Sequence, residues 1–317
     1  MILQAMYACD CHNHPVQEHA GSRQPTSRLL AVPKAFSLRN SVGPAVWVGN
    51  RSPRHAWIDD ALAWRGREQE QEQPVTRIVH QRQPGDVQIA GSANADLDER
   101  WVRDVLMVGA TVESWSDPVL AEITSRFPGL APYSDGSLFD GLVTSIVGQS
   151  ISVASAAVTQ RRLAFLFDEG VELHGRLFAP LPSAGMLAEA SVELIRSSGV
   201  TTRRADALKR IGRLAADGEI PSDDEARRDP ETVETALLGL PQVGKWTAAS
   251  AVHWGVGASD SWPPGDVALL RAARFSFGDD SLTMQEIDRM AEAWRPNRGV
   301  AARLLWTNLF EAMPYSK

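Results

Sequence analysis

The feature that most constrains the fold is a change in hydrophobic period near Asp96. From Leu29 to about Ser92 the chain carries short β-branched or aromatic runs, which predict strands: AVWVG (45–49), TRIVHQ (76–81) and the alternating DVQIA (86–90). Beyond Asp96 apolar residues recur at helical spacing, beginning with Leu97, Trp101, Val105 and Val108. We therefore expect a mainly α protein with a smaller β-rich (α+β) region at its N-terminus.

This change divides the 317 residues into three parts. We expect a disordered tail over 1–28, a β-rich N-terminal domain over 29–112 and a helical domain over 113–317. Pro84 and Gly85 predict the turn between two strands. In the helical part, Ser137 is expected to cap a helical stretch that runs over 137–167, and Asp229 followed by Pro230 is expected to begin another helix.

The composition argues against several kinds of protein. Two cysteines cannot hold a four-cysteine iron–sulfur cluster. They stand close to two histidines in CDCHNH (9–14), but structural zinc sites usually join ligands from separated segments, so we expect no metal and no cofactor. No apolar run approaches the roughly 18 residues that cross a membrane, and no secretory signal is recognisable, so we expect a cytoplasmic protein. A formal net charge of −7 argues against a protein that coats nucleic acid by bulk charge.

The stretch LPQVGKWTAASAVHW (240–254) predicts two helices joined by a very short turn. The amides at the start of the second helix have no partner within that helix, and with the helix dipole behind them they suit a phosphate. Such a turn can equally be a hairpin that only packs. Soon after it, Asp266 follows Pro-Gly and precedes the apolar run VALL (267–270). Aspartate is a preferred helix cap, and a catalytic carboxylate would also suit this place.

These two stretches, LPQVGKWTA and PPGD, resemble the helix-hairpin-helix DNA glycosylase superfamily. Three further stretches fit the same family in the same order: SIVGQSISVASAA (145–157), GVTTRRADALKRIGRLA (199–215) and WRPNRGVAARLLW (294–306). Together they resemble most closely its bacterial 3-methyladenine DNA glycosylase II branch, over about residues 100–310. The resemblance implies two helical lobes with a cleft between them, a hairpin that grips DNA at the rim, and Asp266 inside as the catalytic carboxylate.

The implied chemistry is base flipping followed by cleavage of the N-glycosidic bond. A base inside a duplex cannot be reached, so such enzymes move the nucleotide into a pocket. A preorganised carboxylate then stabilises the developing oxocarbenium ion, or activates water. Where the strand-cutting members carry a lysine, this chain has Trp246, with Lys245 one residue away. The resemblance therefore implies a monofunctional enzyme with Trp246, Trp306 and Gln149 in its pocket, although a tryptophan in a helix can also be a core residue.

The same resemblance implies which residues contact double-stranded DNA: Gln242, Val243, Gly244, Lys245, Thr247, Arg203 and Arg204. The basic cluster around Arg203 can also be an ordinary solvated helix face. Several positions depart from the family. Gln242 replaces the usual first glycine of the hairpin, and Ser150 replaces a bulky wedge, whose task Gln149 or Ile151 would have to take. An aromatic residue is also expected near Ser250, and another where Val267 stands.

We therefore expect a monomeric DNA N-glycosylase that excises alkylated, 3-methyladenine-type purines in base excision repair, cytoplasmic and associated with the nucleoid. One alternative is a glycosylase for an oxidised or deaminated base. Another is a non-catalytic module that binds damaged DNA, which the retained Asp266 argues against.

Overall fold

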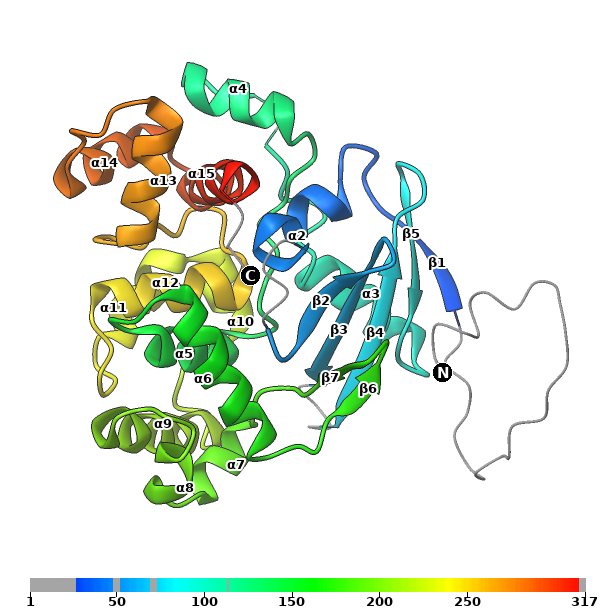
Figure 1. The fold of residues 1–317 in the computed structure, drawn as a ribbon, viewed down its shortest axis with the longest axis vertical. Coiled ribbons are helices and arrows are strands. Elements are labelled where there is room, and N and C mark those ends of the chain that lie inside the picture. The colour runs from blue at the N-terminus through cyan, green and yellow to red at the C-terminus, as the bar shows by residue number, and fades with distance from the viewer. Residues whose placement is uncertain (1–26, 48–51, 69–72, 113, 314–317) are drawn as a thin grey trace, which may run out of the picture.

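The computed structural model describes residues 27–47, 52–68, 73–112 and 114–313. The CDCHNH cluster and residues 1–26 of the expected tail lie outside these described residues. Figure 1 shows a β-sheet on one side and a larger set of helices on the other. The predicted class, mainly helical with a β-rich N-terminal region, is confirmed.

The sheet is antiparallel, with five strands in the order β1-β5-β4-β3-β2. The strands are β1 (Ser27–Ala31), β2 (His55–Ile58), β3 (Ala61–Arg67), β4 (Pro74–His80) and β5 (Asp86–Ala90). TRIVHQ and DVQIA are therefore strands, and Pro84 and Gly85 lie in the turn between them, as predicted. Val87 and Ile89 are fully buried on one face of β5, which explains the alternation of this run.

The prediction of a strand at AVWVG is wrong. Residues 45–47 lie in helix α2 (Leu38–Trp47), and residues 48–49 are outside the described part of the chain. Leu38 and Val42, one turn apart, are fully buried in the same core as Leu62 and Val79 of the sheet. Packing of this helix on the sheet decides the conformation, because β propensity depends strongly on context. The expected helix after Asp96 is present as α3 (Ala95–Asp104).

The helical part contains two hydrophobic cores. One is built mainly from α5 (Leu138–Gly148), α6 (Val153–Phe165), α7 (Ala184–Glu189), α8 (Val192–Arg196), α9 (Thr202–Ala216), α10 (Asp223–Arg228), α11 (Pro230–Leu237) and α12 (Lys245–Val256). The other is built mainly from α4 (Pro118–Arg126), α13 (Val267–Phe277), α14 (Met284–Ala291), a 3₁₀ turn (Glu292–Trp294) and α15 (Arg298–Ala312). Two lobes of helices result. Within the described residues, no helix is long and apolar enough to cross a membrane.

Two predicted helix starts are confirmed by their caps. The Ser137 side chain accepts a hydrogen bond from the amide of Asp140, and that of Asp229 accepts one from Thr232. The stretch 137–167 is nevertheless two helices, separated at residues 149–152. Ser150 has φ of 55°, the left-handed conformation that a continuous helix excludes.

A small hairpin in the helical half escaped the sequence analysis. Strands β6 (Val171–Leu173) and β7 (Arg176–Phe178) pair with each other, and Leu173 and Phe178 pack against Ala56 and Ile78 of the large sheet. Figure 1 shows this hairpin beside β3 and β4. The three-residue strands give little alternation to recognise in the sequence.

Helices α5 and α12 cross at very close range, and residues of both helices line the same cavity. A β-carbon on Gly141 of α5 would overlap the carbonyl of Ala251, and one on Gly255 of α12 would come within 2.7 Å of the Ser137 carbonyl oxygen. Glycine at these two positions lets the backbones approach. Side chains on the neighbouring turns of both helices are therefore brought to one cavity.

Candidate active site

The predicted turn between two helices is present between α11 and α12. Gly244 caps α12, and its carbonyl accepts the first helical hydrogen bond, from the amide of Ala248 at 2.9 Å. The amides of Lys245, Trp246 and Thr247 thus precede the helical ladder and have no acceptor within it. Gly244 and Lys245 are exposed. The turn therefore presents donors outward, as an anion site at a helix start requires.

The positive φ of the turn falls on Gln242, at 62°. This is the position where the resembled family usually has glycine, so glutamine accepts a conformation that glycine adopts without strain. Gly244 itself has φ of −99°, which any residue adopts, and a β-carbon there would meet open space. Glycine at 244 is thus required by neither backbone geometry nor packing within the chain.

Asp266 is the N-cap of α13 and also faces a cavity. One carboxylate oxygen accepts from the amide of Leu269 at 2.7 Å, and the other accepts from the indole Nε1 of Trp246 at 2.8 Å. The two interpretations of this residue, cap and site residue, are therefore compatible. Its carboxylate is held from two directions at the wall of the cavity.

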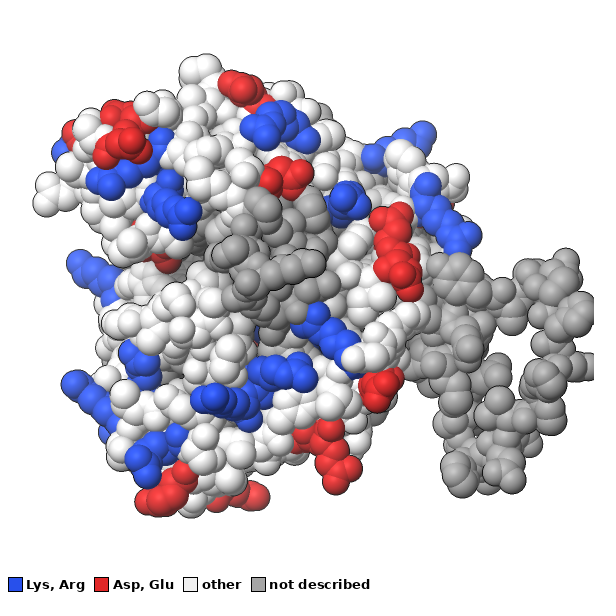
Figure 2. All heavy atoms as spheres, viewed as in Figure 1, with Lys and Arg blue, Asp and Glu red and all other residues white. Residues whose placement is uncertain are grey.

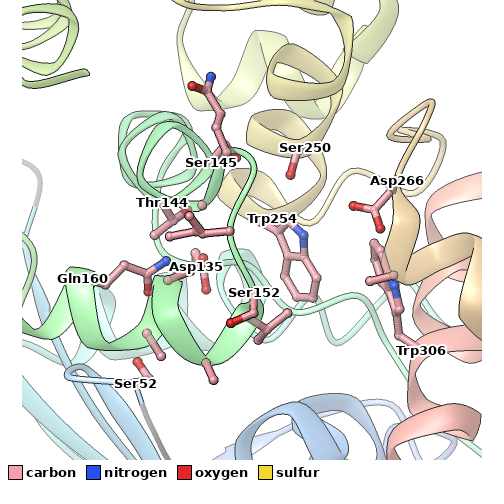
Figure 3. A pocket seen from close by; sticks show the side chains of 18 of the residues that line it. Ser52, Asp135, Thr144, Ser145, Ser152, Gln160, Ser250, Trp254, Asp266 and Trp306 are labelled. Carbon is pink, nitrogen blue, oxygen red and sulfur yellow. The ribbon is translucent and has the colours of Figure 1, made fainter. Parts of the chain in front are cut away.

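The cavity has a volume of about 780 Å³ and is lined from both lobes and from the sheet side. Trp246, Ser250 and Trp254 face it from α12, spaced four residues apart on one side of that helix. Trp306 comes from α15 and Asp266 from the start of α13. Figure 3 shows Asp266 and Trp306 on one side of Trp254, with Asp135, Gln160 and Ser52 on the other.

Trp306 lies in the wall of this cavity and is also largely buried, at 5% exposure. Its ring stacks on Trp254 at 5.2 Å between centroids, with 28° between planes. Trp254 was not singled out from the sequence. Its spacing of eight residues from Trp246, about two helical turns, nevertheless places both on the same side of α12. Behind it, the Arg303 guanidinium lies 3.5 Å from the Trp254 ring centroid and donates to the Tyr133 carbonyl at 2.7 Å. The aromatic wall is thus fixed from behind.

Burial governs the protonation of the groups behind the wall. It lowers the pKa of Arg303 to about 10 and raises that of Tyr133 to about 12, so neither group titrates near neutral pH. Burial, with the nearby Arg303 charge, also lowers the pKa of His253 well below its ordinary value. His253 is therefore neutral there, and its edge packs against both Trp254 and Trp306.

No protein-family model matches the chain, but it is similar in sequence and fold to known proteins. It is 29% identical to DNA-3-methyladenine glycosylase 2 of Escherichia coli over 59% of this chain and 63% of that protein. Its fold matches that of the 3-methyladenine DNA-glycosylase of Archaeoglobus fulgidus, with a TM-score of 0.74, 17% identity and coverage of 90% and 99% of the two chains. The fold of an 8-oxoguanine glycosylase/lyase from Clostridium acetobutylicum matches with a TM-score of 0.67, 15% identity and coverage of 89% and 95%.

The chain belongs to the helix-hairpin-helix DNA glycosylase superfamily. It spans 63% of the length of the E. coli relative.

Gln149, the third residue predicted for the pocket, also lines the cavity, and its side chain is hydrogen-bonded to the hairpin. Its side-chain amide donates to the Gln242 carbonyl at 2.8 Å and to the Thr247 hydroxyl at 3.0 Å. It therefore ties the end of α5 to the hairpin from the edge of the cavity. Thr247 is 3% exposed, so its side chain serves this tie, while its backbone amide stays at the helix start. Ile151 is 40% exposed at the cavity mouth.

The basic cluster on α9 separates into two groups. Arg203, Arg210 and Arg213 are exposed. Arg204 instead donates to the Gln149 carbonyl at 2.6 Å, and Lys209 donates to the Ala190 carbonyl at 2.7 Å. Figure 2 shows Lys and Arg side chains over the part of this face where Figure 1 draws α6, α9 and α12.

The remaining residues predicted to contact DNA differ in their exposure. Val243 is buried at 8% exposure and anchors the turn in the first helical core, so only its backbone suits a phosphate contact. Lys245 is exposed one residue from the cavity-lining Trp246. Among the described residues, no group of three or more His, Cys, Asp and Glu side chains is placed to hold a metal ion.

Proposed function

We propose that this protein is a monofunctional DNA N-glycosylase that flips damaged purines, chiefly alkylated 3-methyladenine-type bases, out of duplex DNA and hydrolyses the N-glycosidic bond. The observation that carries the proposal is Asp266, a carboxylate held by Trp246 and Leu269 at the wall of an aromatic cavity. We propose that it acts as a monomer on nucleoid DNA in the cytoplasm. The names of its relatives support the choice of lesion.

The proposed reaction begins at the hairpin. The outward amides at the start of α12 bind a backbone phosphate, since a helix N-terminus favours an anion without side-chain charge. The exposed arginines of α9 lie near the rest of the DNA backbone. This grip suits a protein whose net charge is −7, because it does not rely on bulk attraction.

The flipped base then enters the cavity beside Trp254 and Trp306. A purine alkylated at N3 or N7 carries a positive charge, which the faces of indole rings attract by roughly 1–2 kcal/mol when water is excluded. The C1′–N9 bond breaks with its electron pair going to the base, and the sugar gains oxocarbenium character. Asp266 stabilises this cation, and water adds at C1′ to give the abasic site.

We propose that no strand cleavage follows, because the position of the catalytic lysine is occupied by Trp246. Neighbouring residues on a helix point about 100° apart, so an amine at Lys245 faces another direction. Ile151 is our candidate for the wedge that fills the gap in the duplex, since it is an exposed apolar side chain at the cavity mouth.

The deciding experiment is incubation with randomly methylated duplex DNA, followed by analysis of the released bases. Release of 3-methyladenine, with breaks that appear only after heat or alkali, is the expected result. No release from methylated DNA, together with release from a duplex that carries an oxidised or deaminated base, would favour the runner-up lesion class, in line with the fold of the 8-oxoguanine glycosylase/lyase. Binding of damaged DNA without release would favour the non-catalytic module.

A further inference from the structure

One cavity-lining side chain has no task in the mechanism above. Ser250 is 4% exposed and sits one helical turn from both Trp246 and Trp254 on the cavity side of α12. Among the described residues its hydroxyl has no hydrogen-bond partner, and yet it is not sealed inside the protein as the Ser145 hydroxyl is. Figure 3 shows Ser250 projecting from α12 between Ser145 and Asp266.

A buried hydroxyl at the cavity surface that has no partner within the protein indicates that a ligand supplies the partner. Buried polar groups in proteins are generally hydrogen-bonded, and those without a partner often mark a functional position. A serine hydroxyl can donate one hydrogen bond and accept two. Ser250 is therefore placed to donate to whatever fills the cavity.

Its position along α12 indicates which part of the nucleotide it meets. Trp246, at the start of the helix, donates to Asp266, which in the proposed function faces the sugar. Ser250 comes one turn deeper, and the stacked pair of Trp254 and Trp306 bounds the cavity next to it. In a complex of the proposed kind, the sugar end of the nucleotide would lie at Trp246 and the base at Ser250.

We propose that Ser250 determines lesion specificity by donating a hydrogen bond to a ring nitrogen of the flipped base, and that it extends the site to damaged purines without a positive charge. This inference rests on the proposed glycosylase function. When the C1′–N9 bond of a neutral purine breaks, the electron pair leaves with the base, which becomes an anion until solvent protonates it. Water supplies the oxygen that bonds to C1′, and its proton passes to Asp266 or to solvent.

A cationic base behaves differently in the same step. A purine alkylated at N7 leaves as a neutral molecule, so little negative charge develops for the hydroxyl to stabilise. Only an interaction that strengthens in the transition state accelerates the reaction. The Ser250 hydroxyl should therefore contribute to excision of neutral bases and contribute little to excision of cationic ones.

The test compares two duplexes, one with a single hypoxanthine (neutral) and one with a single 7-methylguanine (cationic), in single-turnover assays with excess enzyme. Ser250→Ala is expected to slow hypoxanthine excision about tenfold or more, as expected for loss of a donor to a developing charge. It should leave 7-methylguanine excision within about twofold, which also reports that the variant folds. Ser250→Thr, which keeps the hydroxyl, should restore hypoxanthine excision.

Thr124→Val is the control, because it removes another buried hydroxyl that has no hydrogen-bond partner, and Thr124 of α4 does not line the cavity. It is expected to leave the ratio of the two rates unchanged. An equal effect of Ser250→Ala on both lesions, or none on hypoxanthine, would overturn the inference. So would a wild-type protein that releases 7-methylguanine but no hypoxanthine. Failure of the wild type to release either base would instead count against the proposed function itself.

Discussion

Helix α12 serves two regions of the molecule that are built from different chemistry. At its N-terminus the groups that face outward are backbone amides, behind an exposed glycine cap with no side-chain hydrogen bond. Along its side the groups that face the cavity are the side chains of Trp246, Ser250 and Trp254. Backbone amides contact phosphate without regard to base, whereas ring faces and hydroxyls meet the base itself. Substitutions at the helix start should therefore weaken DNA binding, whereas substitutions in the cavity should slow base excision.

The largest expected effect belongs to the cavity. Asp266→Asn should lower base excision about a thousandfold, the equivalent of about 4 kcal/mol in the transition state, while DNA binding stays close to wild type. Asparagine is also a good helix cap, so α13 keeps its start. The variant is measured by single-turnover excision and by binding to an uncleavable duplex.

Asp229→Asn is the control for this change, because Asp229 caps α11 in the same way but does not line the cavity. Its excision rate should match that of the wild type. An Asp266→Asn rate within tenfold of the wild type would contradict the catalytic assignment.

The next prediction concerns the boundary between the two regions, where exposed Lys245 adjoins Trp246. We expect no covalent protein–DNA adduct when borohydride is added during reaction with damaged or abasic duplex DNA. An amine on the first residue of the helix lies outside the cavity, so it does not form a Schiff base with C1′. Efficient trapping that disappears in Lys245→Ala would show that the enzyme also cuts the strand.

A smaller effect is expected at the hairpin. Gly244→Val should weaken binding to damaged and undamaged duplexes alike, by about tenfold, as expected when a hydrogen bond to a charged group is lost. The fold should be unaffected, because φ at this position is negative and a β-carbon meets open space. Fluorescence anisotropy with both duplexes measures the effect, and circular dichroism checks the fold.

Gly109→Val provides the comparison, since a β-carbon there also meets open space, far along the chain from the hairpin. It should bind DNA like the wild type. If Gly244→Val binds undamaged DNA as tightly as the wild type, the turn only packs two helices together.

Much of this architecture follows from local signals, and the exceptions are non-local. The caps at Ser137 and Asp229 are short-range hydrogen bonds, so the sequence pattern is enough to predict them. The helix over 38–47 is favoured by the sheet beneath it, which no local pattern in AVWVG reveals. The tie from Gln149 to Thr247 joins residues 98 positions apart, and a motif does not encode such a contact. Trp254 is different, because its spacing of eight residues, about two helical turns, from Trp246 was visible in the sequence.

The smallest effect is expected in the scaffold that supports both regions. Glu234 of α11 lies 2.6 Å from the Ser261 hydroxyl, which also lies 2.9 Å from the Ala249 carbonyl oxygen of α12. The hydroxyl has one proton, so a protonated Glu234 satisfies all three groups. Burial raises the pKa of Glu234 to about 7, with Glu231 and Asp260 adding to the rise and the Ser261 hydrogen bond and Arg298 opposing it.

Because the folded pKa is above the ordinary value of about 4.5, protonation of Glu234 stabilises the fold fully below that value, and this stability is lost as pH rises through about 7. Glu234→Gln keeps a donor at every pH. Its Tm relative to the wild type should therefore rise between pH 5 and pH 8, by about 2 °C or more. Glu122→Gln, which changes an exposed carboxylate on α4 that does not influence the pKa of Glu234, is the control and should show no such rise. A Tm difference for Glu234→Gln that is the same at both pH values would contradict the prediction, because it would mean that the folded-state pKa of Glu234 is not raised into this range.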